Sequence, residues 1–178
     1  MRHPLESIPQ ESRKRFFLTF LFLTLILFAI FRVLDKPLQT DYAPSGIVSF
    51  ELAGSPQNAA HIVLTWTETA MLNAAFGLGI DYLFMPVYAF SLAFGSLLAA
   101  GRHGGWLKSL GAVAGYGAFA AALFDAVENY ALFQILLGAF NSSYPAIAAV
   151  CATVKFALLV FGLVYAVVGG VIPRSAKA

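Results

Sequence analysis

Four apolar runs, each long enough to cross a membrane, constrain this chain more than any other feature. They cover residues 16–34, 71–100, 109–140 and 146–172. The shortest has 19 residues, and at ~1.5 Å per residue a helix of that length spans about 28 Å, close to the thickness of the hydrocarbon core. Every backbone polar group must be satisfied inside lipid, so each run should be helical. The sequence therefore predicts an all-α, four-transmembrane helical bundle.

The composition argues against a soluble domain and against a nucleic-acid-binding protein. Of the 178 residues, 60% are hydrophobic and 11% are charged, whereas a soluble domain typically has about 25% charged residues. The net charge is only +2, so we expect the lipid bilayer rather than nucleic acid as the partner. The single cysteine, Cys151, excludes an intrachain disulfide.

The polar segments divide the chain into one membrane domain with a short tail at each end. The first apolar run exceeds the usual length of a signal-peptide core and lacks a small-x-small cleavage site, so we interpret it as a retained anchor. The stretch 46–54 is unusually apolar for a loop and contains Glu51, and we expect it to pack against the bundle. The predicted segments are a tail at 1–15, the domain at 16–172 with an outer loop and amphipathic helix at 35–70, and a tail at 173–178.

The predicted amphipathic helix begins after Ser55, because serine is a favourable N-cap and Pro56 suits the first helical position. We expect it to lie at the membrane interface with Trp66 at headgroup level. One face should carry Ala59, Ile62, Val63 and Trp66, and the other should carry His61, Thr65 and Glu68.

The distribution of basic residues predicts the orientation in the membrane. Eight of the 11 Lys and Arg residues fall on the side that holds both termini. Cytoplasmic loops carry an excess of Lys and Arg, so we expect both termini in the cytoplasm and the protein in the cytoplasmic (inner) membrane. The eight residues are Arg2, Arg13, Lys14, Arg15, Arg102, Lys108, Arg174 and Lys177.

The third apolar run contains polar residues where hydrocarbon makes them expensive. Asp125, Glu128 and Asn129 stand at i, i+3 and i+4 and so share one helix face. A charge at bilayer depth costs at least ~2.5 kcal/mol on insertion scales, so such residues usually have a partner or a function. Asp81 in the second run and Lys155 in the fourth are the candidate partners.

Counting along the helices predicts that these residues meet. At ~1.5 Å per residue, Asp81, Asp125 and Lys155 lie roughly 30, 27 and 25 Å from the cytoplasmic edge. Each stands on a stripe of small residues, which lets membrane helices approach closely. We therefore predict an acidic pocket near the outer leaflet. Its predicted ligand-binding residues are Asp81, Tyr88, Asp125, Glu128, Asn129 and Lys155, with Glu51, His61 and Glu68 as a possible lid.

A charge imbalance provides the functional argument, because three carboxylates face a single amine in the predicted pocket. About two acids must be protonated, bind a cation or be matched by a ligand. Our leading hypothesis is a binding or transport module for a small cationic or amphiphilic ligand. One alternative is an intramembrane enzyme that acts on a lipid or isoprenoid by carboxyl general acid/base chemistry. Another is a structural or assembly subunit held by buried ion pairs.

The sequence indicates neither a cofactor nor a metal, and it identifies no catalytic residue. The spacing Asp125-x-x-Glu128 lacks the Glu-x-x-His partner of a carboxylate metal site. The ammonium group of Lys155 would compete with Mg²⁺ or Ca²⁺ for the same oxygens. Gly111-x-x-x-Gly115 is a helix-packing motif that could act within the chain or join a homodimer.

Three strings resemble recurrent pieces of small four-span bacterial integral membrane proteins. They are GIVSFELAG at 46–54, DYLF at 81–84 and DAVEN at 125–129. The resemblance covers residues 46–167 and implies the same fold, but no activity is assigned to those proteins. In architecture alone, the chain is loosely similar to the EXPERA group of sterol isomerases and sigma-2-type receptors, which also place acids inside a short helical bundle, and this similarity carries over no residue roles.

Overall fold

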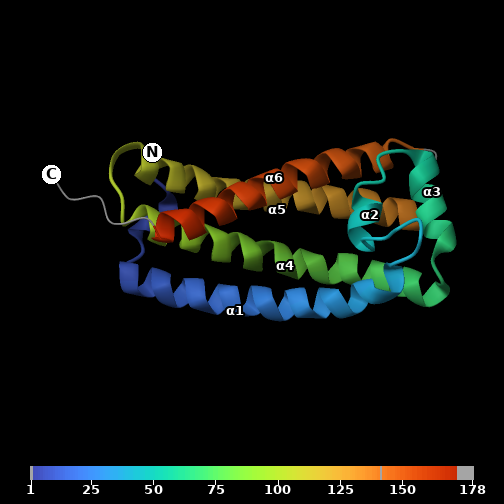
Figure 1. The fold of residues 1–178 in the computed structure, drawn as a ribbon, viewed down its shortest axis with the longest axis horizontal. Helices are drawn as coiled ribbons and strands as arrows, with labels where there is room; N and C mark the ends of the chain where they lie inside the picture. Colours follow the sequence, from blue (N-terminus) through green and yellow to red (C-terminus); the bar gives the residue numbers. More distant parts are fainter. Residues whose placement is uncertain (1, 141, 172–178) are drawn as a thin grey trace. The chain divides into compact units, whose positions relative to one another are not determined.

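The computed structural model describes residues 2–140 and 142–171, so the predicted tail at 173–178 lies outside it. The described residues form helices, turns and loops and no strand, which confirms the all-α fold. The elements in chain order are η1 (Pro4–Ser7), α1 (Gln10–Asp35), η2 (Lys36–Leu38), α2 (Ile47–Glu51), α3 (Pro56–Thr65), α4 (Glu68–Ala100), α5 (Gly105–Leu136) and α6 (Tyr144–Val171) (Figure 1).

Four helices, α1, α4, α5 and α6, are long and apolar enough to cross a membrane. Their bounds differ from the predicted runs mainly because helices continue beyond their apolar cores. The first begins at Gln10 rather than at 16, within the polar N-terminal segment. The third covers 105–136 rather than 109–140, because Gly138 takes a positive φ of 96° and the amide of Ala139 bonds back to the carbonyl of Gln134. α4 continues as one helix through Pro86.

The chain folds as two compact units that are each built from several segments. Unit 1 contains Met1–Leu25, Pro86–Ala122 and Lys155–Ala178. Unit 2 contains Ile26–Met85 and Leu123–Val154. Most predicted site residues belong to unit 2, whereas Tyr88 and Lys155 belong to unit 1.

Stacked aromatic rings and small residues hold unit 1 together. The ring of Phe16 on α1 stacks on Phe94 of α4 at 5.6 Å between centroids, and Phe20 stacks on Phe90 at 5.0 Å. Such pairs contribute about 0.5–1.5 kcal/mol each beyond the area they bury. At Gly111 an added Cβ would lie 2.5 Å from the Cβ of Ala100, so this helix contact requires glycine. The Gly111 end of the predicted packing motif thus serves contacts within the chain.

The N-terminal segment of unit 1 is anchored by a buried histidine. His3 is 4% exposed, and its ring centroid lies 4.3 Å from that of Tyr116 on α5. The ring Nδ1 accepts a hydrogen bond from the amide of Leu5 at 3.2 Å. Burial lowers the pKa of His3, and the nearby Glu6 carboxylate opposes this shift only in part. The neutral ring is therefore the form that fits this site.

In unit 2 the connection between α1 and α4 is built into the core. Residues 46–54 pack into the helices as predicted, because Phe50 of α2 is 1% exposed and its ring meets Trp66 edge-on at 5.1 Å. Figure 1 shows α2 and α3 beside the parts of α4, α5 and α6 that belong to this unit. The expectation for Trp66 was wrong. Its indole is buried and donates from Nε1 to the carbonyl of Leu38 at 2.8 Å, so it is a core residue and not a headgroup anchor.

The amphipathic helix starts where predicted and ends earlier. The Ser55 hydroxyl accepts from the amide of Asn58 at 3.2 Å, which confirms the N-cap, and Pro56 begins α3. The helix ends at Thr65, since Trp66 is extended with ψ of 135°. Glu68 therefore begins α4 and does not share a helix with His61, contrary to the prediction. The buried and exposed faces of α3 itself are as expected, with Ala59, Ile62 and Val63 in the core.

The start of α2 is fixed by a contact between residues distant in sequence. The Asp35 carboxylate at the end of α1 accepts from the amide of Ile47 at 2.7 Å. Gly46, the residue before α2, has φ of 57° and ψ of −125°, a conformation open almost only to glycine. A Cβ at this position would also collide with the Asp35 carboxylate.

We predict that Gly46→Ala destabilises the protein by about 1–3 kcal/mol, because alanine disfavours this backbone conformation and its Cβ collides with Asp35. Thermal unfolding in detergent micelles would measure the change. The matched control is Gly79→Ala, where a Cβ meets nothing within 4 Å and φ is not positive. Equal unfolding temperatures for the two variants would contradict the proposed strain.

We also predict that the N-terminal anchor weakens in acid. The folded-state pKa of His3 lies below its ordinary value, so the unfolded segment binds protons more readily than the docked one. The contribution of docking to stability is present above a pH of about 6.5 and decreases as the pH falls below it. Hydrogen-exchange protection at the Leu5 amide should fall accordingly.

Two variants provide the control for this pH effect. His3→Phe keeps an aromatic ring that cannot titrate but removes the acceptor of the Leu5 amide, so here the Glu6 amide, which bonds to the carbonyl of residue 3 at 2.9 Å, is the reporter and its protection should not respond to pH. His61→Phe removes an exposed histidine and should leave the response unchanged. The same acid response in His3→Phe as in the natural sequence would disprove the role of His3.

Candidate functional site

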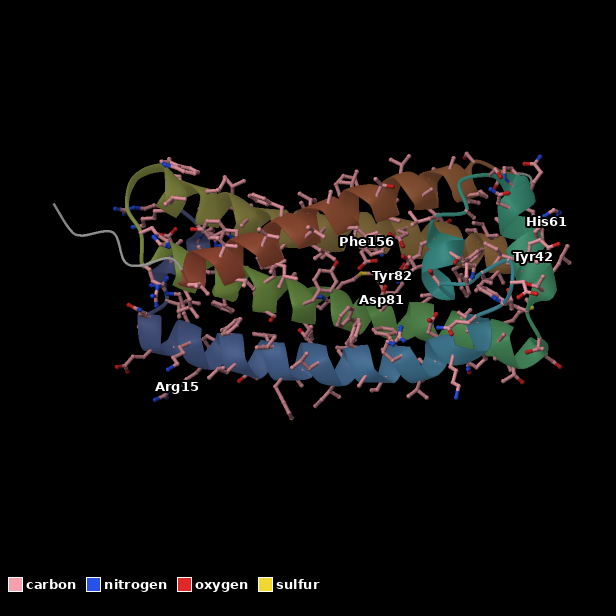
Figure 2. The ribbon with its side chains drawn as sticks, viewed as in Figure 1. Arg15, Tyr42, His61, Asp81, Tyr82 and Phe156 are labelled. Carbon is pink, nitrogen blue, oxygen red and sulfur yellow. The ribbon has the colours of Figure 1, made fainter. Side chains whose placement is uncertain are left out.

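Polar side chains of α5 are buried together on one helix face in unit 2. Asp125 is 2% exposed, Glu128 0% and Asn129 1%. Their burial confirms that this face points into the protein and not toward lipid. Asp81 on α4 is half-buried, and Figure 2 labels it beside Tyr82. The stripe of small residues predicted on α5 continues from this group, with Ala118 also fully buried.

Asn129 connects the two helices that carry this group. Its Nδ2 donates to the carboxylate Oδ2 of Asp81 at 2.9 Å and to the carbonyl of Leu78 at 3.2 Å. Both partners are acceptors, so this network fixes the orientation of the amide. The other amide atom, Oδ1, is buried and has no hydrogen-bond partner among the described residues. A buried acceptor without a partner raises the free energy of the folded protein, so binding a hydrogen-bond donor there would be favourable.

A second connection between the same helices was missed by the sequence reasoning. The Tyr82 hydroxyl donates to the carbonyl of Ala126 at 3.2 Å. Tyr82 is exposed, and tyrosines in apolar runs are common. The one signal in the sequence for this contact was the position of Tyr82 next to Asp81. Two consecutive residues lie at nearly the same height on a helix, so both can reach the same neighbouring helix.

The three residues predicted as a lid behave differently from one another. Glu51, on α2, is 7% exposed and thus buried within unit 2. His61 is exposed, and its ring meets that of Tyr42 at 5.9 Å (Figure 2). Glu68 is also exposed and lies 13 residues before Asp81 on α4, a separation of about 20 Å along the helix. His61 and Glu68 are therefore exposed side chains, unlike the buried Glu51.

The two remaining predicted residues, Tyr88 and Lys155, belong to unit 1. Tyr88 is 6% exposed and Lys155 is 5% exposed, so neither faces lipid. The ammonium group of Lys155 lies 4.7 Å from the centroid of the Phe156 ring, within the range of a cation–π interaction. Figure 2 labels Phe156 on α6.

Buried acids outnumber buried amines in the part of the chain that the structure describes. The acids Glu51, Asp125 and Glu128 are each at most 7% exposed, whereas Lys155 is the one buried Lys or Arg. No group of three or more His, Cys, Asp or Glu among the described residues is arranged to hold a metal ion.

Comparison of the chain with protein-family models, with curated proteins and with solved structures found no match. The resemblance to four-span bacterial membrane proteins thus stays a prediction.

We predict that Asp81 and Asn129 are energetically coupled, because removing either leaves the other with a lost hydrogen bond. A double-mutant cycle with Asp81→Ala and Asn129→Ala should give a coupling energy of about 0.6–1.7 kcal/mol, the range for hydrogen bonds between membrane helices. Unfolding in mixed detergent micelles would measure it.

The control cycle combines Asn129→Ala with Glu68→Ala. Glu68 is exposed and distant along α4, so the two effects should add. Additive effects for Asp81 and Asn129 as well would show that the bond between them contributes nothing to stability.

Proposed function

We propose that this integral membrane protein is a binding or transport module for a small cationic or amphiphilic ligand, with proton exchange at its buried carboxyl groups. Four helices long and apolar enough to cross a membrane support the membrane part of this proposal. The ligand chemistry follows from the buried polar group of unit 2, which consists of Asp81, Asp125, Glu128 and Asn129.

The observation that carries the proposal is the unpartnered Oδ1 of Asn129 within an acid-rich group. This atom is an acceptor, it is fully buried, and its amide is fixed by bonds to Asp81 and Leu78. The amide oxygen requires a hydrogen-bond donor, and the acidic side chains around it favour a donor that carries positive charge. A protonated amine meets both requirements with one group.

Protons and ligand should compete for this site. A carboxyl group that binds a proton is neutral and attracts a cation less strongly. Ligand binding should therefore release protons, and acidification should weaken binding. In a membrane such an exchange can couple the movement of a cation to that of protons, which is the transport form of the proposal.

We predict that the purified protein in phosphatidylcholine nanodiscs binds phenethylammonium, a protonated primary amine, and that Asp125→Asn lowers its affinity at least about tenfold, the effect of removing one close charge at roughly 1.4 kcal/mol. Isothermal titration calorimetry would measure the affinity, with empty nanodiscs for background. Affinity should also fall as the pH is lowered.

Two matched controls make the test specific. Phenylpropionate has a similar shape and the opposite charge, so it should not bind above background. Glu68→Gln removes an exposed acid and should leave the affinity unchanged. Equal binding of both ions, or equal loss in both variants, would refute an acidic binding site.

A further inference from the structure

A groove on unit 1 lies apart from the acidic group described above. Its volume is about 200 Å³, and it is bounded by the start of α5 and the last turns of α6. The lining residues that matter here are Leu107, Leu110, Phe161, Val164, Val168 and His103. Val164 and Val168 are 53% and 48% exposed, so this wall of the groove faces the lipid of a membrane-spanning protein.

The walls and size of the groove suit a hydrocarbon chain. Apart from His103 and Tyr165, the lining side chains are apolar, and the Tyr165 hydroxyl already donates to the carbonyl of Leu107 at 2.8 Å. Drug-sized ligands occupy sites of about 300–1,000 Å³, whereas an apolar cavity of about 150 Å³ already holds a molecule such as benzene. A groove of intermediate volume accommodates a segment of an acyl chain.

His103 is the histidine among the residues that line the groove. Its Nε2–H donates to the carbonyl of Gly169 at 2.7 Å, which connects the α4–α5 turn to α6. In this tautomer Nδ1 is an acceptor, and it is buried without a hydrogen-bond partner among the described residues. His103 is itself 7% exposed. The groove is therefore lined in part by a polar side chain, which directly follows Arg102 in sequence.

Unit 1 is strongly basic, and two of its basic residues flank the groove lining in sequence. Arg102 and Lys108 flank the lining residues His103 and Leu107 in sequence, and the Arg102 Nε has no hydrogen-bond partner within the described chain. Trp106, between them, is 72% exposed, as expected for an aromatic residue at headgroup level. The described part of unit 1 contains two acids, Glu6 and Glu11, and seven basic residues, which are Arg2, Arg13, Lys14, Arg15, Arg102, Lys108 and Lys155.

We propose that this groove binds an anionic phospholipid, with one acyl chain between α5 and α6 and the phosphate held by Arg102 and Lys108. Charge complementarity selects the occupant, because basic pockets between membrane helices recognise anionic headgroups. An apolar chain in the groove and a phosphate at the flanking basic residues match the two halves of one lipid molecule. The site would hold that lipid as a bound partner distinct from the surrounding bilayer.

Native mass spectrometry of the full-length protein tests this proposal. Detergent-purified protein would be mixed with dioleoyl phosphatidylglycerol or with dioleoyl phosphatidylcholine, which have the same chains and different headgroup charge. The protein should retain the anionic lipid over the zwitterionic one. Arg102→Gln and Lys108→Gln together should abolish this preference, with about a fivefold loss per basic residue.

The acyl-chain half is tested by filling the groove from its lipid face. Val168→Trp should lower retention of both lipids about tenfold, because the indole occupies the volume between α5 and α6. Val167→Trp is the matched control, since Val167 is 57% exposed and does not line the groove. Gel filtration and the unfolding temperature would verify that each variant is folded.

Several outcomes would overturn the proposal. Equal retention of both lipids by the natural sequence would show that Arg102 and Lys108 do not form a site for an anionic headgroup. Equal lipid retention by Val168→Trp and Val167→Trp would show that the acyl chain does not bind in the groove. A change of oligomeric mass in Val168→Trp without a change in lipid retention would identify the groove as a contact between two copies. If Val168→Trp does not fold, the surface pair Arg102→Gln and Lys108→Gln still decides the headgroup half.

Discussion

The cost of placing a charge in hydrocarbon is the constraint on which this structure depends. A carboxylate at the centre of a bilayer is unfavourable by several kcal/mol unless the protein surrounds it. Asp125 and Glu128 on α5 meet this constraint by complete burial in unit 2, beside the amide of Asn129. Small residues on the same face let the neighbouring helices approach closely enough to enclose them. Close packing of the helices therefore also keeps the polar group away from lipid.

Charge is divided unevenly between the two units. The described part of unit 2 has seven acids and two Lys or Arg residues, and that of unit 1 has two acids and seven Lys or Arg residues. This division parallels the tendency of basic residues to collect at one membrane surface. It also gives each unit its own chemistry, with a cation-binding group proposed for one and a phosphate-binding groove for the other.

The periodicity of the sequence was sufficient to predict the long helices and the side of α5 that the polar residues share. The spacing of Asp125, Glu128 and Asn129 predicted a common face, because residues at i, i+3 and i+4 lie on one side of a helix. Polar side chains avoid lipid, so that side was expected to be buried. The start of α3 was equally predictable, since Ser55 and Pro56 act through local backbone geometry. These features depend on residues within one or two turns of each other.

What could not be predicted depends on contacts between distant residues. Trp66 suits either a headgroup belt or a core, and its bond to Leu38 decided the matter. The short helix α2 exists because Asp35, 12 residues before Ile47, binds its first amide. Likewise, the exposure of His61 and Glu68 follows from the break between α3 and α4 at Trp66, which no periodic pattern marked.

Helix α1 differs from the other long helices in that none of its most apolar window is buried inside the protein. Its contacts within unit 1 are made by a few rings, such as Phe16 and Phe20. Most of its side chains therefore need only be apolar enough for lipid, and they need not fit the shape of a neighbouring helix. Over evolutionary time this helix should exchange one apolar residue for another freely, while the enclosed faces of α4 and α5 accept few replacements.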